Sequence, residues 1–272
     1  MKSVPVISVV VPSYNQGRFL AECLDSIVSQ QYPALELIVM DGGSTDQSVD
    51  VIRRYEGHLS HWQSGPDGGQ SAAINAGVLR ARGDLVAWLN SDDLYHDNAL
   101  WAVARAWSHL PGRGLYIGNG FRLDDQTKLR TRHNQRHMAF SRRALREGLD
   151  YVLQPSAFFH RADWDATGGL DERLQFCMDW DILIRIAERN AVVLVDDFLS
   201  LSREYEDTKT ASGGFRRVDE LLRMVKSHTG QEMTIGGSVY AMWTLLAEQM
   251  SGSVSDAFRH HINQALLDAT QR

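Results

Sequence analysis

The chain has 272 residues, of which 43% are hydrophobic and 23% are charged, and its formal net charge at pH 7 is -6. This composition is typical of a globular protein that buries a sizeable core, as one large domain or as one domain with an appendage. The acidic balance argues against a general nucleic-acid-binding protein, because contact with phosphates needs a basic face. Nucleic acid is therefore not an expected partner.

Two further features bear on the compartment. No apolar run reaches the roughly 18 residues that a membrane span requires, and the apolar start from Val4 to Val11 is short enough to predict a strand instead. The two cysteines, Cys23 and Cys177, lie far apart and do not indicate a disulfide framework. These features predict a cytoplasmic protein, and peripheral association with the inner face of a membrane stays open.

The first hundred residues alternate between buried-strand patterns and amphipathic-helix patterns. We expect strands at residues 7–11, 35–40 and 86–89, and helices at residues 20–28, 49–55 and 71–79. Strands and helices that alternate in this way predict a parallel sheet with right-handed crossovers.

Polar residues follow three of these strands: Tyr14 and Asn15 follow the first, Asp41 the second, and Asp92 the third. Because ligands of open α/β sheets bind beyond the carboxyl ends of the strands, these loops are expected to meet in one crevice. Carboxylate oxygens there suit Mg²⁺ or Mn²⁺. Taken singly, Asp41 could be a turn residue, and Ser91 or Asp92 could cap a helix beginning near Leu94.

The second half of the chain predicts strands at residues 115–117, 154–159 and 192–195. Gly168 and Gly169 indicate a turn, and a helix follows that carries Asp179 and Asp181 at or just before its start, where one of them could be a cap. Beyond Phe215 apolar residues recur at helical spacing. We expect those faces to pack on the parent domain, with a homodimer contact or a membrane contact as the alternatives.

The motifs VVVPSYNQ, VMDGGSTD, SGPDGGQSAAINAG and WLNSDD together resemble the nucleotide-sugar-binding half of the inverting family 2 glycosyltransferases. The later QPS, GGLDE and MDWD segments resemble the acceptor half of the same family. The resemblance implies a GT-A type α/β fold, with a mostly parallel central sheet flanked by helices. It further implies a catalytic domain over 1–212, divided into a Rossmann-like nucleotide-sugar-binding half (1–110) and an acceptor half (111–212), and a helical C-terminal extension over 213–272.

The resemblance also implies roles for individual residues. Asp179 matches the catalytic base, Asp181 a structural helix cap, and Asp92 the aspartate that binds Mg²⁺ or Mn²⁺ beside the diphosphate. The positions expected to bind the nucleotide sugar are Pro12, Tyr14, Asn15, Asp41, Asp67, Gln70, Ser91 and Asp92.

The chain departs from the family pattern at three positions. Asn90 stands where the family has the first aspartate of its D-x-D motif, which leaves Asp92, with Asp93 as a second candidate, to carry the charge. Met178 replaces an acid before the base, and Tyr205 replaces a histidine that can touch the metal or diphosphate. With that histidine absent, Arg203 and Lys209 become candidate diphosphate contacts.

The implied activity is transfer of a sugar from a nucleoside diphosphate sugar to a hydroxyl of a saccharide or lipid-linked acceptor, in the synthesis of cell-surface polysaccharide, lipopolysaccharide or glycolipid. The three departures favour one alternative, a catalytically inactive nucleotide-sugar-binding or scaffold module of the same fold. A sugar nucleotidyltransferase would want a glycine-rich loop with a basic residue after the first strand, where this chain has Ser13-Tyr14-Asn15-Gln16.

Overall fold

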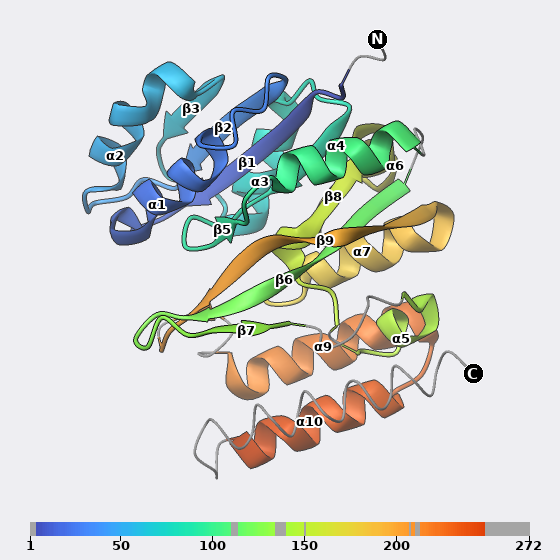
Figure 1. Ribbon diagram of the computed structural model, residues 1–272. Helices are drawn as coiled ribbons and strands as arrows, with labels where there is room; N and C mark the ends of the chain where they lie inside the picture. Colours follow the sequence, from blue (N-terminus) through green and yellow to red (C-terminus); the bar gives the residue numbers. More distant parts are fainter. Residues whose placement is uncertain are drawn as a thin grey trace.

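The computed structural model describes residues 4–109, 114–133, 140–149, 151–206, 208–209 and 213–247. A nine-stranded sheet forms its centre, and helices lie on both faces of that sheet (Figure 1). The strand order is β3-β2-β1-β4-β8-β6-β9-β5, and β7 pairs with β6 outside this path.

The first half is a parallel sheet with crossover helices, as the sequence predicts. Its four neighbouring strands, all parallel, are β1 (Ile7–Ser13), β2 (Leu35–Asp41), β3 (His61–Ser64) and β4 (Leu85–Trp88). Its helices are α1 (Gly17–Val28), α2 (Ser48–Tyr55) with the 3-10 turn η1 (Glu56–His58), and α3 (Gln70–Arg80). The edge strand β3 was not predicted, because its sequence HWQS has no apolar run.

Two hydrophobic clusters cover the two faces of the sheet. Successive residues of a strand point to opposite faces, so Val9 and Val11 join the cluster of α1, α2 and α4, whereas Val10 joins the cluster of α3, α7 and α9. All three valines are fully buried. Burial on both faces explains why β1 reads as an unbroken apolar run.

The second half adds antiparallel pairing. Its elements are β5 (Leu94–Tyr95), α4 (Ala99–His109), β6 (Gly114–Asp124), β7 (Arg130–Arg132), α5 (Arg142–Arg146), η2 (Gln154–Ser156), β8 (Ala157–His160), α6 (Arg161–Thr167), α7 (Met178–Arg189) and β9 (Ala191–Glu204). Strand β8 runs antiparallel to both β4 and β6, while β6 and β9 are parallel.

The predicted bounds of the strands in this half were wrong: the segment expected as a strand at 154–159 begins with the 3-10 turn η2 and becomes β8 only at Ala157. Strands β6 and β9 are much longer than predicted, because they pair from Gly114 and Ala191 as far as Asp124 and Glu204, through register shifts near Asn119. No helix begins near Leu94 in the described chain, since that residue starts β5 and α4 begins only at Ala99. Asp92 is therefore not a helix cap.

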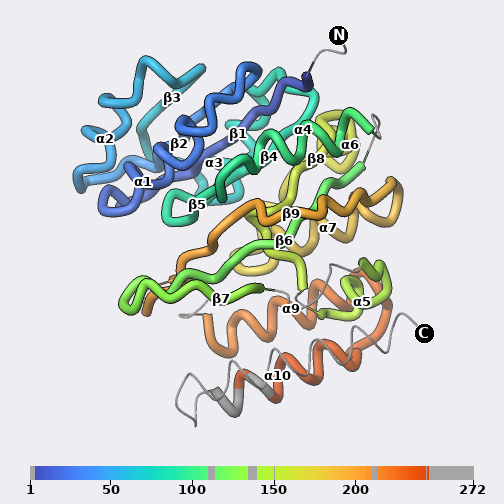
Figure 2. Tube along the Cα trace, viewed as in Figure 1, coloured from blue at the N-terminus to red at the C-terminus, as the bar shows by residue number. Residues whose placement is uncertain are grey.

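The C-terminal extension consists of α9 (Gly214–Thr229) and α10 (Ile235–Ala247) in the described ranges. Figures 1 and 2 show α9 lying between α10 and the rest of the molecule. Val218, Leu221 and Val225 of α9 are buried in the same cluster as α7, so α9 packs on the parent domain as predicted. The helical apolar pattern also includes Phe258, Ile262 and Leu266, which lie outside the described residues. The domain boundary at residue 212 stays a prediction.

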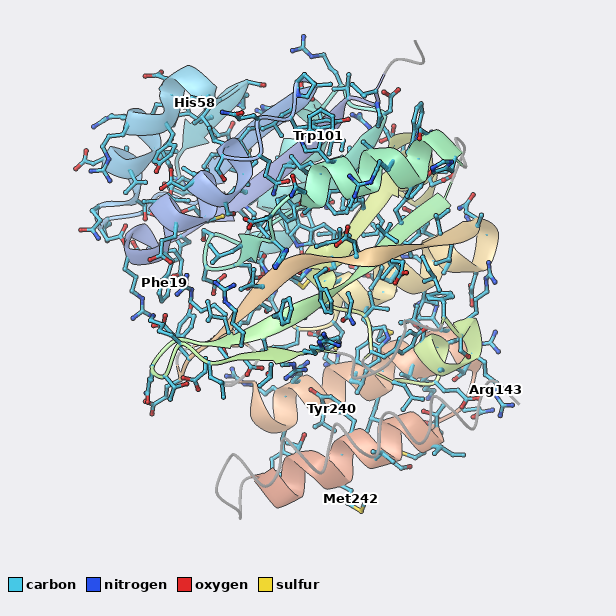
Figure 3. The ribbon with its side chains drawn as sticks, in the orientation of Figure 1. Phe19, His58, Trp101, Arg143, Tyr240 and Met242 are labelled. Atoms are coloured by element: carbon cyan, nitrogen blue, oxygen red, sulfur yellow. The ribbon has the colours of Figure 1, made fainter. Side chains whose placement is uncertain are left out.

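Helix α10 covers α9 with one side only. Tyr240 is 6% exposed and lies between the two helices, with the Arg217 guanidinium 5.1 Å from its ring centre, whereas Met242 points outward (Figure 3). Across the described ranges, no helix combines the length and the apolar character that crossing a membrane demands.

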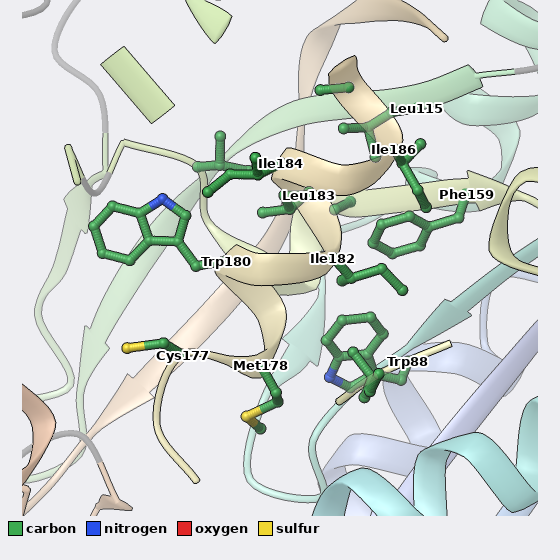
Figure 4. Packing of buried hydrophobic residues seen from close by; sticks show 14 of the residues in the cluster. Trp88, Leu115, Phe159, Cys177, Met178, Trp180, Ile182, Leu183, Ile184 and Ile186 are labelled. Atoms are coloured by element: carbon green, nitrogen blue, oxygen red, sulfur yellow. The ribbon is translucent and has the colours of Figure 1, made fainter. Parts of the chain in front are cut away.

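Helix α7 is fixed to the sheet by its apolar face. Ile182 and Ile186 are fully buried and lie toward the aromatic pair of Trp88 and Phe159, whose rings stack at 5.5 Å (Figure 4). The Trp180 indole donates a 2.9 Å hydrogen bond to the Leu145 carbonyl on the other side of the helix. These contacts hold the helix whose first turn carries Asp179.

Candidate active site

The polar loops after β1, β2 and β3 lie side by side at the carboxyl edge of the sheet. Ser13 pairs with Asp41, and Asp41 pairs with Ser64, in the register of neighbouring strands. The amide of Leu89, just beyond β4, bonds the Val10 carbonyl at 2.9 Å and brings the Asn90–Asp93 turn to the same edge. The strand tips therefore converge as the sequence analysis expects.

Asp41 organises the loop that follows β2. Its carboxylate is 2% exposed and accepts hydrogen bonds from the hydroxyls of Ser44 and Ser64 and from the amides of Gly43 and Ser44. A buried carboxylate needs such donors to offset its desolvation. In this structure Asp41 therefore fixes the shape of the loop.

Tyr14 and Asp67 flank Gly42 and form an open platform. A Cβ atom at Gly42 would lie 3.3 Å from the Tyr14 ring and 3.1 Å from Asp67 Oδ2, so only glycine leaves this space clear. The Tyr14 ring is 62% exposed, and Asp67 Oδ1 accepts the Gly69 amide at 2.7 Å. An exposed ring beside a carboxylate can take the face and the polar edge of a planar ligand.

Two other predicted residues, Pro12 and Asn15, lie in the chain on either side of Tyr14. Pro12 is buried within β1. Asn15 has a positive φ of 51°, and its side-chain oxygen accepts the Thr45 amide at 2.9 Å, which ties the first loop to the second. Asn15 thereby holds the platform together.

The turn after β4 presents one carboxylate and buries the other. The Asp93 side chain is 4% exposed and accepts the amide of Arg203 at 2.9 Å and the amide group of Asn90 at 3.3 Å. Burial, and then the neighbouring Asp92 charge, raise the pKa of Asp93 to about 8. Asp93 is therefore a structural residue, and Asp92 is the more accessible carboxylate of the turn.

Tyr205 meets Asp92 directly. Its hydroxyl donates to Asp92 Oδ2 at 2.8 Å and accepts from Gln16 Nε2 at 3.0 Å. Burial, and then the Asp92 charge, raise the pKa of Tyr205 to about 12, so the phenol stays protonated and keeps donating. The Arg18 guanidinium lies 4.8 Å over its ring. Tyr205, which stands where the family resemblance implies a histidine, thus contacts the Asp92 carboxylate.

The fit of a divalent cation can be judged from these oxygens. The described residues contain no group of three His, Cys, Asp or Glu side chains suited to a metal ion. Gln16, which bonds the Tyr205 hydroxyl that contacts Asp92, has a buried side-chain oxygen, Oε1, with no hydrogen-bond partner among the described residues. Mg²⁺ is usually held by one or two carboxylates together with substrate phosphates. The residues therefore fit a cation that is shared with a bound diphosphate.

A directed chain of amide groups links this turn to the rest of the site. Gln154 Nε2 donates to the Trp88 carbonyl at 3.0 Å, so its Oε1 faces and accepts from Asn90. Asn90 Oδ1 in turn accepts from Gln70, whose own oxygen accepts from Lys209 Nζ at 2.9 Å. Asn90 has a donor role here that an aspartate could not fill, which explains the departure from D-x-D.

Two further predicted positions near the turn serve its framework. Ser91 is 4% exposed within the turn. Arg203, which the sequence left as a candidate diphosphate contact, is 3% exposed and donates to the Asp92 carbonyl and to the carboxylates of Asp125 and Glu22. The Arg203 guanidinium is thus engaged by protein acceptors, and Lys209 is the better candidate for a diphosphate contact.

Asp179 lies in the first turn of α7, where its Oδ1 accepts the Trp180 amide at 2.9 Å. The Lys209 side chain is exposed, yet desolvation by the protein lowers its pKa, while the charges of Asp179 and Glu220 act in the opposite direction. Lys209 thus interacts electrostatically with Asp179, and it is bonded to Gln70 at the end of the amide chain that leads to Asn90 and the Asp92 turn.

The expectation that Asp181 caps α7 was wrong. The N-cap position is Cys177, and Asp181 instead forms a 2.6 Å ion pair with Arg185 and a 2.8 Å contact with His228 Nε2. Burial alone would raise the pKa of Asp181, but the His228 hydrogen bond and the Arg185 charge outweigh it and lower the pKa. Asp181 is structural, as expected, through long side-chain contacts.

Two features could not be predicted from the sequence: the contact of Tyr205 with Asp92, and the hydrogen bonds of Glu220 to the chain before α7. The first pair is 113 residues apart in sequence, and neither periodicity nor motif spacing carries a signal for it. Only the pairing of β9 with β5 and β6 brings the end of β9 to the turn after β4.

The fold and the site define an α/β protein whose polar loops meet at the carboxyl edge of its sheet, and the fold is of the GT-A type. The profile of glycosyl transferase family 2 matches residues 8–165, so the chain belongs to this family. An uncharacterised glycosyltransferase of Mycobacterium tuberculosis is 32% identical over 189 residues, which are 69% of this chain and 71% of that protein.

Two solved structures share the fold. TarS of S. aureus, residues 1–349, in complex with UDP-GlcNAc, has a TM-score of 0.65 at 17% identity over 88% of this chain and 71% of that one. The mannosyltransferase PcManGT of Pyrobaculum calidifontis, in complex with GDP-Man and Mn²⁺, has a TM-score of 0.61 at 18% identity over 99% of this chain and 76% of that one.

Proposed function

We propose that the protein is an inverting glycosyltransferase that moves a sugar from a nucleoside diphosphate sugar to an acceptor hydroxyl. The observation that carries this proposal is the linkage through Lys209. This cation bonds Gln70, which leads through Asn90 to the Asp92 turn, and its charge interacts with Asp179. We infer that one site would then contain a carboxylate for a cation, Asp92, and a second carboxylate for a proton, Asp179.

The donor would bind along the carboxyl edge of the sheet. The exposed Tyr14 ring and the Asp67 carboxylate would take the nucleoside, on the loop framework made by Pro12, Asn15 and Asp41. UDP-GlcNAc bound to TarS and GDP-Man bound to PcManGT support a nucleotide sugar as the donor class. The diphosphate would lie toward Gln70, Ser91 and Asp92.

Asp92 would hold Mg²⁺ or Mn²⁺, with diphosphate oxygens as the other ligands. The metal, when bound, would offset the negative charge that grows on the leaving diphosphate. Lys209 would add a positive charge on the Gln70 side. The Mn²⁺ in PcManGT supports this assignment, and so does the unpartnered Gln16 Oε1 next to Tyr205.

Asp179 would act as the general base. One carboxylate oxygen would take the proton of the acceptor hydroxyl as that hydroxyl oxygen forms its bond to the anomeric carbon. The bond between the anomeric carbon and the diphosphate oxygen breaks in the same step, and the diphosphate leaves with the electron pair. A single displacement of this kind inverts the anomeric configuration.

The acceptor class is a saccharide or lipid-linked hydroxyl compound, and the product belongs to a cell-surface polysaccharide, lipopolysaccharide or glycolipid. The resemblance of the QPS, GGLDE and MDWD segments to the acceptor half of the family supports this assignment. The two cysteines are free and buried, which agrees with the proposed cytoplasmic location. We include in the proposal that the C-terminal extension would make a peripheral membrane contact or a homodimer contact.

Nucleotide-sugar hydrolysis tests the proposal. Purified protein is incubated with UDP-GlcNAc or GDP-mannose in the presence of Mn²⁺, and release of UDP or GDP is measured. In parallel, thermal unfolding with and without each ligand reports binding, because a ligand of the folded state raises its stability. The proposal expects binding and slow nucleotide release for at least one donor class.

The alternative is an inactive nucleotide-sugar-binding module. Asn90, Met178 and Tyr205 in place of polar or acidic family residues favour it. Binding without nucleotide release, with water and with a panel of saccharide acceptors, would support the module and contradict the enzyme.

A further inference from the structure

Glu220, in the C-terminal helix α9, binds the chain directly before α7. Its side chain is 6% exposed, and its two oxygens accept the backbone amides of Gln175 at 2.8 Å, Phe176 at 2.6 Å and Cys177 at 2.8 Å. Three charge-assisted hydrogen bonds to one buried carboxylate form a specific clamp. The clamp spans 43 residues of sequence at its shortest.

These three amides lie directly before the first turn of α7, and that of Cys177 belongs to its N-cap residue. The first amides of a helix have no partner within it, and a carboxylate placed there is stabilised by the helix dipole. The N-cap residue of α7 is Cys177, whose thiol is a weak acceptor. Glu220 therefore anchors the segment that leads into α7, up to the amide of the N-cap residue itself.

A second contact from α9 holds the same turn. His228 Nε2 lies 2.8 Å from Asp181 Oδ1, and Asp181 is also paired with Arg185. The start of α9 is close as well, since a Cβ atom at Gly213 would lie 3.0 Å from the Phe176 ring. Helix α9 thus contacts the chain on both sides of Asp179.

We propose that Glu220 is a positioning residue for the base Asp179, so that the C-terminal extension is a working part of the acceptor side of the site. This inference rests on the proposed function. Glu220 fixes residues 175–177 and so sets the direction in which the first turn of α7 presents the Asp179 carboxylate. A small displacement of a catalytic group is enough to slow a reaction by about 10²-fold.

Three variants test this role. Glu220→Ala removes all three acceptor contacts, while Glu220→Gln keeps one oxygen and turns an amide donor toward the backbone. Asp219→Ala is the matched control, because Asp219 is the neighbouring acid of the same helix, is 70% exposed and forms a surface ion pair with Arg223 at 2.9 Å. The three variants separate loss of the clamp from loss of an acid on α9.

The readouts are kcat and KM for nucleotide release from UDP-GlcNAc or GDP-mannose with Mn²⁺, and amide hydrogen exchange over residues 173–180. We expect Glu220→Ala to lower kcat by about 10- to 100-fold, with the donor KM within twofold of wild type. Glu220→Gln should fall between it and wild type, and Asp219→Ala should match wild type. Exchange at residues 175–177 should accelerate in both Glu220 variants.

The proposal is overturned if Glu220→Ala keeps the kcat of Asp219→Ala, or if its kcat falls only together with donor binding. Unchanged exchange at residues 175–177 would also overturn it. Where Glu220→Ala does not fold, Glu220→Gln decides by the same criteria. Wild-type protein that releases nucleotide from neither donor contradicts the proposed function instead, and the exchange measurement then still decides whether Glu220 clamps the segment.

Discussion

The donor edge and the acceptor side of the site are built in different ways. On the donor edge, Asp41 takes its hydrogen bonds from residues of its own loop and of the next strand, and Asn15 bonds the adjacent loop. On the acceptor side, the first turn of α7 is held by Glu220 and His228 from a helix far along the chain. A local loop framework can therefore keep its shape alone, whereas the proposed base depends on distant parts of the fold.

The largest effect is expected from Asp179→Asn, which should lower turnover without changing donor binding. Asp179→Asn keeps the size of the side chain but removes its ability to take a proton, so turnover should fall by about 10²- to 10⁴-fold. Donor binding, measured by thermal shift with UDP-GlcNAc or GDP-mannose, should stay close to wild type because the donor loops are untouched. Turnover within a few-fold of wild type would show that another group is the base.

The donor edge has its own decisive variant. Asp92→Ala removes the carboxylate assigned to the cation, so the Mn²⁺-dependent part of the donor thermal shift should disappear and turnover should fall by about 10²-fold or more, since a bound metal supplies several kcal/mol of charge stabilisation. Asp97→Ala, at an exposed aspartate five positions on, is the control. An unchanged Mn²⁺ dependence in Asp92→Ala would place the cation elsewhere.

Much of the donor edge could be predicted from the sequence because its cause is local. The run from Val9 to Val11 predicts a buried strand, and parallel topology alone carries the residues after each strand to a common edge. The ends of β6 and β9 could not be predicted, because pairing with each other, rather than their own patterns, extends these strands.

Side-chain contacts between the two halves of the chain could not be predicted from the sequence either. Tyr205 was noted as a departure from a family histidine, but nothing in its neighbours shows that it bonds Asp92. Glu220 sits among helical residues with the spacing of an ordinary exposed acid, and it is buried only because α9 packs beside the start of α7. The edge strand β3 was missed because its polar side chains follow no strand pattern.

The hydrogen bonds between Asn75 of α3 and Leu170, before α7, also join the donor edge to the acceptor side. Substitutions at two neighbouring glycines test this connection. Gly168 and Gly169 both have φ of 78°, so alanine is strained at either position. A Cβ atom at Gly169 would lie 2.6 Å from Asn75 Oδ1 of α3, while at Gly168 no described atom lies within 4 Å. In urea unfolding, Gly169→Ala should cost about 1–3 kcal/mol more than Gly168→Ala.

The unfolding free energies of the two glycine variants can also contradict this prediction. Asn75 bonds both the amide and the carbonyl of Leu170, and the predicted difference depends on that clasp between α3 and the turn before α7. Equal unfolding free energies for the two variants would mean that the Asn75 side chain can move without loss of stability. Its hydrogen bonds to Leu170 would then not couple the two regions.

The smallest expected effect concerns acid stability of the acceptor side. The pKa of Asp181 is lowered in the folded protein, so its ion pair stabilises the fold fully above the ordinary carboxyl pKa near 4, and this contribution is lost as pH falls through the lower folded value. Asp181→Asn should therefore lose less stability than wild type between pH 6 and pH 3, by at most about 1 kcal/mol, because pH 3 lies only about one unit below the ordinary carboxyl pKa. Urea unfolding at both pH values measures the difference, with the exposed Asp219→Asn as control.

Equal acid sensitivity of Asp181→Asn and wild type would show that the contacts with Arg185 and His228 do not stabilise the folded state. The acceptor side would then need another explanation for its order, and Glu220 would remain as the main candidate.

The central claim is that a carboxylate on α7 activates an acceptor for direct displacement at a donor held by the Asp92 turn. Proton NMR during hydrolysis of an α-linked donor, UDP-GlcNAc or GDP-mannose, with Mn²⁺ tests it most directly, because the first anomer of the released sugar is visible before mutarotation. The account predicts the β-anomer first, and first appearance of the α-anomer would contradict it.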